Sequence, residues 1–431
     1  MIPRQYTNDV LPGGEVSLAG WVAGIRDLGN IKFFLLRDRE GLLQVTAKKG
    51  VAPAGMLEAI QALGREDVVR VAGKAVASTQ APRGVELIPG QLEVLVKAAA
   101  PLPIDIGDKI ESNLDKRLDH RVLDLRNPRN LAIFKVQARL VEGMQLELAR
   151  QGFLQVFTPA LMGAPSESGA DVFPVFYFNR EVYLRQDPQL HRQLLIAGGF
   201  DRLYDLGPSW RAEHSNTTRH LCEHRGIAPE MTLTDEGDTM RLEEDVVVAG
   251  ITRVKEHCAA ELDLLGVKVQ VPEKPFPELR FPAVNAILAK MGKDLPRGED
   301  LDRESEKLLA EHVKKKYEAD FFFVNRFPFK VKPFYVMRDG EWARSVDMIY
   351  KGTELSSGGQ REHRYDRIIQ QITEKKMAPD SLQWFTEPFK YGVPPHGGFC
   401  IGIERFTMKL LDIENVREAV LFPRTPERCL P

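Results

Sequence analysis

The chain has 431 residues, of which 59 are Lys or Arg and 61 are Asp or Glu, so its formal net charge is −2. This balance excludes a histone-like or polybasic protein, although a basic patch on a neutral protein is enough to bind nucleic acid. The hydrophobic fraction of 43% is enough to build packed cores, and the length predicts two or three domains.

Membrane insertion and disulfide bonding are not expected. No apolar run reaches the length that a bilayer requires, and the first ten residues, MIPRQYTNDV, are polar and contain no apolar signal core. The four cysteines lie far apart and form no C-x-x-C pair, which argues against a zinc site and a disulfide framework. We therefore expect a cytoplasmic protein.

Residues 1–100 are predicted to form a small β-barrel. Residues 15–46 alternate apolar and polar positions with glycine-rich breaks, and two more strand-like runs follow at 67–78 and 84–98. A helical stretch at 52–64 separates the two pairs. Five or so short strands with one inserted helix fit a Greek-key barrel of the oligonucleotide-binding (OB) type. A small barrel without a ligand fits the same pattern equally well.

The character of the chain changes after this barrel. Residues 101–129 are polar with proline at both ends, which indicates a linker or hinge, and an amphipathic helix is predicted at 130–152. In the remaining part, to residue 431, strands do not alternate regularly with helices, which favours an α+β domain on a largely antiparallel sheet. Neither G-x-x-x-x-G-K-[ST] nor a helix-opening G-x-G-x-x-G is present.

The segment 209–231 is the first of three that place polar residues in otherwise apolar strands. Arg211 and Glu213 alternate with apolar neighbours, and Arg219 follows a turn-like stretch. A hairpin that projects two arginines onto one face suits a polyphosphate, because the guanidinium fork binds phosphate oxygens in bidentate fashion. A surface ion pair would explain Arg211 and Glu213 as well.

The second segment, 346–364, contains Asp347, Glu354 and Ser357. These hard oxygen ligands fit a magnesium ion held jointly with substrate phosphates, although the Ser-Ser-Gly-Gly stretch also fits a mobile loop. The third segment, 394–406, is a glycine-rich apolar strand that we expect to end in Glu404 and Arg405. Its glycines, Gly398 and Gly402, would let a flat base or a ribose approach the backbone, or else mark a bulge. Together the three segments favour an ATP site.

At these residues the chain resembles the class II aminoacyl-tRNA synthetases that have an N-terminal anticodon-binding barrel. WRAEHSNTTRHL resembles their motif 2, CIGIERF their motif 3, and GFLQVFTPAL, with Pro159, their motif 1. Within this group the chain is similar to aspartyl-tRNA synthetases of the archaeal and eukaryotic type. That similarity is carried by SESGADVF, RQDPQLHRQ, GTELSSGGQREHR, GVPPHGGFCIGIER and LFPRTPERCLP.

The resemblance implies that the chain binds ATP and Mg²⁺, activates L-aspartate and transfers it to tRNA(Asp), with tRNA(Asn) left open as a second acceptor. Arg211, Arg405 and Glu354 would be catalytic. Glu354, Ser357 and Asp347 would hold the metal. The residues that would bind ATP are Arg211, Ala212, Glu213, Arg219, His220, Leu221, Glu354, Gly402, Ile403, Glu404 and Arg405.

The resemblance also implies sites for the amino acid and the tRNA. Glu167 and Gln189 would bind the α-amino group, and Arg361 and Arg192 the side-chain carboxylate, with Arg211 and Ser357 completing the pocket. In the barrel, Phe33 would stack on an anticodon base, while Gln44 and Glu86 would bond base edges. A homodimer through the segment around Pro159 is expected, with no membrane contact.

Several residues depart from the family pattern. Arg192 stands where the family has lysine, Ser168 and Cys400 stand at glycines, and His224 replaces an aromatic residue that stacks on adenine. Arg192 could also turn away to pair with Asp187 or Glu167. These departures leave three alternatives open: an asparaginyl enzyme, an adenylating paralogue with another product, and an inactive RNA-binding or scaffold protein.

Overall fold

The computed structural model describes residues 3–107, 112–164, 172–212 and 217–431. The chain packs as two compact units, Met1–Ser112 and Asn113–Pro431. Each is described here by itself.

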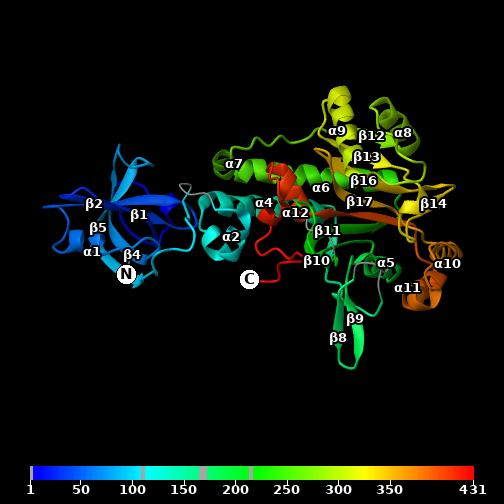
Figure 1. Ribbon diagram of the computed structural model, residues 1–431, viewed down its shortest axis with the longest axis horizontal. Helices are drawn as coiled ribbons and strands as arrows, with labels where there is room; N and C mark the ends of the chain where they lie inside the picture. The colour runs from blue at the N-terminus through cyan, green and yellow to red at the C-terminus, as the bar shows by residue number, and fades with distance from the viewer. Residues whose placement is uncertain (1–2, 108–111, 165–171, 213–216) are drawn as a thin grey trace. The chain divides into compact units, whose positions relative to one another are not determined.

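The first unit is a closed five-stranded barrel with the strand order β1-β2-β3-β5-β4 (Figure 1). This confirms the predicted OB-type barrel with one inserted helix. Its elements are β1 Glu15–Asp27, β2 Ile31–Arg37, β3 Leu42–Lys48, α1 Met56–Gln61, β4 Val68–Ala77 and β5 Val85–Val96. Strand alternation decides which aromatic side chain enters the core: Phe34 is fully buried, whereas Phe33 remains partly exposed on the outer face.

The second unit is built on an eight-stranded sheet with the order β12-β13-β16-β17-β18-β11-β10-β6. Its end pairs, β12 with β13 and β10 with β6, are parallel, and the other pairs are antiparallel. This confirms the predicted α+β class. The strands are β6 Leu154–Val156, β10 Arg202–Trp210, β11 Glu223–Thr232, β12 Glu278–Arg280, β13 Phe321–Asn325, β16 Ser345–Tyr350, β17 Thr353–Gln360 and β18 His396–Gly402.

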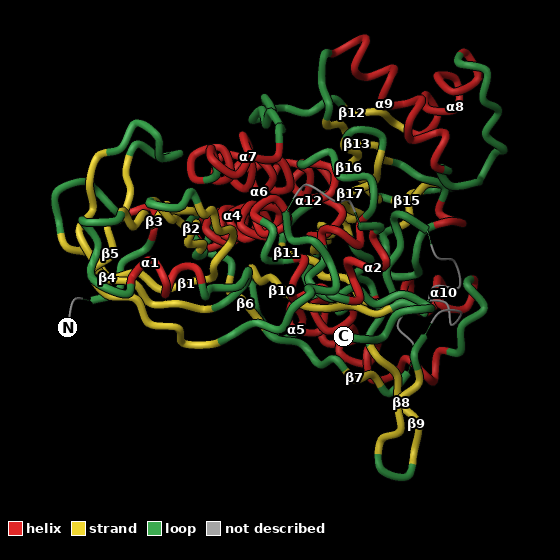
Figure 2. The backbone as a smooth tube through the Cα atoms, turned by 60° about the vertical axis from the view of Figure 1, so that its left-hand side comes forward, coloured by secondary structure: helices red, strands yellow, loops and turns green. Residues whose placement is uncertain are grey.

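Two long helices cover one face of this sheet, α4 Pro128–Arg150 and α6 Glu236–His257, and they lie side by side in both views (Figures 1 and 2). α4 begins where Asn127 accepts from the Arg129 amide and a proline occupies the first turn. The helices cross closely at Gly143, where a Cβ would lie 2.6 Å from the Ala249 carbonyl oxygen. The main core lies between these helices and the sheet.

Shorter elements surround this core. The other helices are α2 Leu114–Asp119, α3 Arg121–Asp124, α5 Gln189–Ala197, α7 Ala259–Leu265, α8 Phe281–Lys290, α9 Arg303–Tyr317, α10 Tyr365–Glu374, α11 Gln383–Thr386 and α12 Ile403–Leu410. Small sheets are formed by β7 Leu161–Met162, β8 Pro174–Tyr177 and β9 Arg180–Leu184, and by β14 Arg338–Asp339 and β15 Trp342–Ala343. The β8–β9 hairpin projects from the body of the unit (Figure 2). Among the described residues, no helix combines the length and apolar character needed to cross a bilayer.

The segment expected to be a linker, 101–129, differs from the prediction in its second half. The second unit already begins at Asn113, and α2 and α3 are part of it. The cause is Arg121, whose side chain is 1% exposed and donates to the carbonyl oxygens of Val420 and Leu421 near the C-terminus. A polar composition predicts a linker only when its charges face water, and this arginine is buried.

Candidate active site

A cleft of about 370 Å³ opens on the second unit, between α5, the β10–β11 hairpin, β17 and the start of α12. It brings together most of the residues expected to bind substrates. The expected residues that line it are Gln189, Arg192, Arg211, Arg219, His220, Leu221, Glu354, Ser357, Arg361, Gly402, Glu404 and Arg405. They come from segments up to 216 positions apart (405 − 189), so the fold assembles one site from them.

Other expected residues lie elsewhere. Ala212 and Ile403 neighbour lining residues but are not among the described residues that line the cleft. Glu213 and Glu167 lie outside the described residues, as does Ser168. Phe33, Gln44 and Glu86 belong to the barrel.

One end of the cleft carries the candidate phosphate-binding arginines. Arg211 follows β10 directly, and its amide donates to the Cys222 carbonyl, which continues the hairpin by one pair. Arg405 Nη1 donates to the Glu354 carbonyl oxygen at 2.9 Å and lies 3.7 Å from the Glu354 carboxylate. Arg219 Nη2 donates to Glu306 of α9 at 3.0 Å. Two of these guanidinium groups thus come from the connection between β10 and β11, and the third comes from α12.

The expected strand through Glu404 and Arg405 is shorter than predicted, because β18 ends at Gly402 and both residues lie in the first turn of α12. The Glu404 carboxylate accepts from the Arg225 amide at 2.9 Å, which ties α12 to β11. Burial raises the pKa of Glu404, against the opposing effect of this amide. The first turn of α12 therefore places Arg405 at the cleft and holds Glu404 against β11.

Gly398 has a different role from the one expected. A Cβ at this position would lie 2.2 Å from the Pro229 carbonyl oxygen and 2.6 Å from Glu230 Oε2. The absence of a side chain therefore lets β18 pack against the Glu230 carboxylate, and the predicted approach of a base or ribose is not what requires this glycine.

The candidate metal ligands lie on β16 and β17. Asp347 accepts from Lys332 Nζ at 2.5 Å and from Ser357 Oγ at 2.6 Å, so a buried lysine already compensates its charge. Burial opposes the charge of Lys332, but Asp347 outweighs it and raises the pKa of the amine. Glu354 is more accessible, with 39% of its side chain exposed.

These oxygens fit a shared magnesium site. In the described part of the chain, no group of three or more His, Cys, Asp or Glu is placed to hold a metal ion. Glu354 and Ser357 could supply hard ligands at the cleft, with the remaining positions left for phosphates and water, as Mg²⁺ prefers. Asp347 would then orient the Ser357 hydroxyl by accepting its hydrogen bond.

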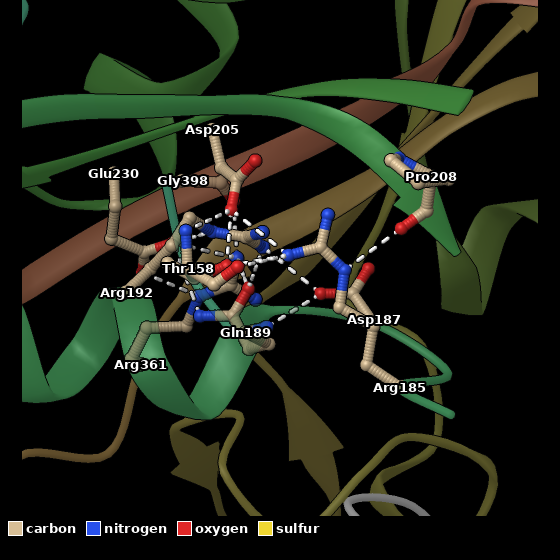
Figure 3. Close-up of polar contacts among 10 residues, drawn as sticks. All are labelled: Thr158, Arg185, Asp187, Gln189, Arg192, Asp205, Pro208, Glu230, Arg361 and Gly398. Carbon is tan, nitrogen blue, oxygen red and sulfur yellow. Dashed lines mark hydrogen bonds and ion pairs between the residues drawn. The ribbon is translucent and has the colours of Figure 1, made fainter. Parts of the chain in front are cut away.

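At the other end of the cleft, a buried carboxylate joins the two arginines expected to bind the amino acid (Figure 3). Arg361 donates through Nε to Glu230 at 2.9 Å, and through Nη2 to Gln189 and to the Gly398 carbonyl, both at 2.9 Å. Burial favours the neutral acid, yet Arg361 and Arg192 outweigh it and hold the pKa of Glu230 below its usual value.

Arg192 lies at the same end and is 1% exposed. Its Nη2 donates to Gln189 at 2.5 Å and lies 3.2 Å from Asp187, and its Nε lies 3.6 Å from Glu230. The pairing with Asp187 is the alternative that the sequence left open. Nε and Nη1 of Arg192 have no hydrogen-bond partner among the described residues. Nε faces the Glu230 carboxylate at 3.6 Å, so Nη1 is the buried donor that can still receive an acceptor.

Two other departures from the family pattern also border the cleft. His224 lines it, and burial, followed by the charges of Arg211 and Arg405, lowers the pKa of its imidazole to about 4. The ring is therefore neutral near pH 7. Cys400 also lines the cleft, with a pKa raised by burial to about 12. A Cβ at Gly226 would lie 2.5 Å from Cys400 Sγ, so the glycine makes room for this thiol.

A neighbouring cluster ties the segment around Pro159 to the same region (Figure 3). Arg185 is buried and donates to the Pro208 carbonyl at 2.8 Å and to Thr158 Oγ1 at 2.6 Å, and it pairs with Asp205 at 3.3 Å. Arg185 is followed within four residues by Gln189 on α5. The segment before β7 is therefore tied to β10 through Thr158, Arg185 and Asp205.

In the barrel, the expected anticodon residues lie close together on the outer face. Phe33 is registered against Thr46, and Gln44 against Glu86. Gln44 Nε2 donates to Glu86 at 2.9 Å, and Thr46 Oγ1 donates to the same carboxylate at 2.6 Å. A partly exposed ring beside a row of polar side chains has the composition of a base-binding surface.

Sequence reasoning missed three charged residues around the cleft. Glu230, Lys332 and Glu306 each pair with an expected site residue. A carboxylate in the apolar run GIAPEM was a usable signal for Glu230, because a buried charge needs a partner. Nothing in the local pattern distinguished Lys332 or Glu306 from surface charges.

Comparison with known proteins gives matches along the whole chain. The family described as "tRNA synthetases class II (D, K and N)" matches residues 113–426, and an "OB-fold nucleic acid binding domain" matches residues 16–95. The chain is 42% identical to the aspartate–tRNA(Asp) ligase of Pyrococcus horikoshii, with 100% of both sequences covered. It is 41% identical to the aspartate–tRNA(Asp/Asn) ligase of Archaeoglobus fulgidus, covering 99% of this chain and 100% of that one. A solved structure, asparaginyl-tRNA synthetase from P. horikoshii complexed with asparaginyl-adenylate, has a TM-score of 0.93 at 33% identity and covers 100% of each chain.

Proposed function

Because this chain belongs to the class II aminoacyl-tRNA synthetases of the D, K and N group, we propose that it is an aspartate–tRNA ligase. It activates L-aspartate with ATP and transfers the aspartyl group to tRNA(Asp). Aminoacylation of tRNA(Asn) with aspartate in the same assay decides whether that tRNA is a second acceptor. The relatives at about 40% identity that carry these activities in their names support the proposal.

The first step needs no protein nucleophile. The α-carboxylate of aspartate attacks the α-phosphorus of ATP, and pyrophosphate leaves to give aspartyl-adenylate. A ribose hydroxyl at the 3′ end of tRNA then attacks the carbonyl carbon, and AMP leaves. Catalysis of both steps consists mainly of positioning and of stabilising negative charge.

The arginine-rich end of the cleft would bind ATP. Arg211 would contact the α-phosphate and the substrate carboxylate, while Arg219, His220 and Arg405 would hold the outer phosphates. The neutral imidazole of His224 would lie against the adenine. Mg²⁺ bound by Glu354 and Ser357 would neutralise phosphate charge.

The observation that carries the choice of aspartate is the buried cluster of Arg192 and Arg361 at the other end. Arg192 Nη1 is buried without an acceptor, and both guanidinium groups present only donors. A side-chain carboxylate would accept hydrogen bonds from both guanidinium groups through its two oxygens. The amide of asparagine has one acceptor oxygen, and its NH₂ group would face guanidinium N–H donors. Each buried donor left unpaired costs about 1–3 kcal/mol, which would favour aspartate.

Binding of tRNA would involve the outer face of the barrel, where Phe33 would stack on an anticodon base beside Gln44 and Glu86. We also propose a homodimer. Large apolar side chains are exposed around Pro159 and on the β8–β9 hairpin, where Phe157, Phe176 and Phe178 are 85%, 95% and 90% exposed. Such a surface is usual for an interface and unusual for a monomer. A tRNA substrate implies action in the cytoplasm.

A second candidate is asparagine–tRNA ligation, favoured by the similarity to a solved asparaginyl-tRNA synthetase. ATP–pyrophosphate exchange with each of the twenty amino acids, with and without tRNA, distinguishes the two. Exchange with aspartate, and aspartylation of tRNA(Asp), is the expected result. Exchange with asparagine alone would replace the first proposal by the second, and exchange with neither would reject both.

A further inference from the structure

We infer that Glu306, on helix α9, is a positioning residue of the nucleotide site, which acts by directing the Arg219 guanidinium toward the outer phosphates of ATP. The inference rests on the proposed function in one respect, namely that a nucleoside triphosphate occupies the cleft. It does not depend on which amino acid is activated.

The geometry gives Glu306 an indirect position. Arg219 Nη2 donates to Glu306 Oε2 at 3.0 Å, and the two side chains are 16% and 11% exposed. Arg219 lines the cleft, whereas Glu306 is not among the described residues that do. The carboxylate therefore supports the guanidinium from outside the cleft and would reach a phosphate only through Arg219.

Glu306 is also within electrostatic reach of two other expected ATP-binding residues, Arg405 and Glu354. Burial raises its pKa, Arg219 and Arg405 oppose this rise, and Glu354 adds to it. A bare carboxylate at this place would repel a polyphosphate. With the Arg219 guanidinium bonded to it, the same charge orients a cation instead.

A support of this kind is useful because Arg219 lies in the loop between β10 and β11, where residues 217–222 form no helix or strand. A long arginine side chain loses rotamer freedom when it binds a ligand, and a partner that orients it beforehand reduces that loss. Helix α9, which carries Glu306, is held in place at its N-terminus and by buried side chains. Its N-cap Asp302 accepts from the Ser305 amide at 2.8 Å, and Leu309 and Val313 are fully buried.

The experiment measures equilibrium binding of MgATP by calorimetry, without amino acid, to wild type, E306Q and E304Q. Glu304 is a matched control, since it is two residues away on α9, 68% exposed and paired with Lys293. We expect E306Q to bind ATP roughly tenfold more weakly, the size expected when one charge-assisted contact is lost. E304Q should bind ATP as wild type does. AMP, which lacks the outer phosphates, should bind equally to all three proteins.

A double-mutant cycle shows whether the effect passes through Arg219. In the R219Q background, E306Q should cause no further loss of ATP affinity. Additive losses, equal weakening of AMP and ATP, or an E306Q protein that binds ATP as well as wild type or better would each overturn the inference. Thermal melting checks that the variants fold. Should E306Q melt early, E306D serves instead, since it keeps the charge at shorter reach and should lose less than tenfold.

The same measurement separates this inference from the proposed function. Wild-type protein that binds MgATP but exchanges no pyrophosphate with aspartate would contradict aspartate activation and leave the role of Glu306 to be decided by the variants. Wild-type protein that does not bind MgATP would overturn both.

Discussion

Arg361 and Glu230 form a buried ion pair, with Arg361 Nε 2.9 Å from Glu230 Oε1 and side chains that are 4% and 0% exposed. The same carboxylate lies 3.6 Å from Arg192 Nε, so a single acid connects both candidate recognition cations. This arrangement fixes the two guanidinium groups before a substrate arrives, and a fixed donor set discriminates between a carboxylate and an amide better than a mobile one.

Replacing Arg361 by Ala should abolish aspartate-dependent pyrophosphate exchange, because the substrate carboxylate loses a donor and Glu230 loses its main partner. Removing one member of a buried pair also costs about 3–5 kcal/mol of stability, so the melting temperature should fall. Arg192→Lys, which keeps the charge, should retain part of the exchange activity. Arg367→Ala is the control, because Arg367 is exposed on α10 and donates to Gln370 of the same helix at 3.1 Å, so its loss should leave exchange unchanged. Full exchange in Arg361→Ala would contradict the assignment.

Replacing Arg405 by Ala should reduce the rate of adenylation by about 10² or more, as expected for the loss of a charge contact made in the transition state. Arg211→Ala should have an effect of the same order. The measurement is pyrophosphate exchange at saturating ATP and aspartate, with Arg202→Ala as the control, since Arg202 bonds the Gln151 carbonyl at the surface. A rate close to that of wild type in Arg405→Ala would reject its role.

A Phe33→Ala protein should form aspartyl-adenylate at the normal rate and charge tRNA poorly. Phe33 is outside the barrel core, so its loss should remove base stacking, worth about 1–3 kcal/mol, without unfolding the barrel. Exchange and aminoacylation are measured on the same preparation. Leu11→Ala, at a residue that is 75% exposed before β1, controls for general surface effects. If both activities fell together, the change would have damaged the fold and stacking would not explain it.

Replacing Phe176 and Phe178 together by Ser should weaken the homodimer. These rings are 95% and 90% exposed on the β8–β9 hairpin, and burying each against a partner contributes about 1.5–3 kcal/mol. Sedimentation at micromolar concentration should show a dimer for wild type and a species of about 48.6 kDa for the double variant. Leu264→Ser on α7, where the residue is 41% exposed, should remain dimeric. A wild-type protein that sediments only as a monomer would contradict the proposal.

Glu243→Gln should stabilise the second unit, by an amount that depends on pH. Glu243 is buried beneath β17, and burial raises the pKa of its carboxyl from 4.5 to about 8. Between these values the unfolded chain is ionised and the folded protein is not, so wild-type stability decreases as pH rises from about 4.5 to about 8 and is level above that. Glutamine removes this dependence, and the gain should reach roughly 3 kcal/mol at pH 7. Melting temperatures of both proteins from pH 5 to pH 8 provide the check, and parallel profiles would refute it.

The architecture was predictable because it follows from repeating patterns. The period of two in the barrel strands required one of Phe33 and Phe34 to face inward, and the family resemblance indicated Phe33 as the outward one. The 3–4 spacing after residue 130 identified α4. The boundary at Gly402 was not predictable, since the run FCIGIERF is apolar enough for a strand and for a helix. A contact between residues far apart in the sequence accompanies the change, since the Arg225 amide donates to the Glu404 carboxylate.

The partners of the site residues were harder to predict than the residues themselves. Arg219 and Glu306 are 87 positions apart, and Arg361 and Glu230 are 131 apart. No periodicity connects such pairs, so an arginine can be assigned to a site while its counter-ion remains unknown. The same limit explains Lys332, which neutralises Asp347 from a segment without regular structure.

Strand β17 begins next to Glu354 and ends next to Arg361, so a single stretch of backbone carries a group for each substrate. Seven residues of extended chain span roughly 23 Å, a distance that the neighbouring strands on both sides hold constant. A shift of the β17 backbone that enlarged the amino-acid pocket would therefore displace Glu354, the candidate Mg²⁺ ligand, by a similar distance. We therefore expect a new substrate preference to involve exchange of side chains, and Arg192, which belongs to α5 and not to the sheet, is one position where an exchange would leave β17 in place.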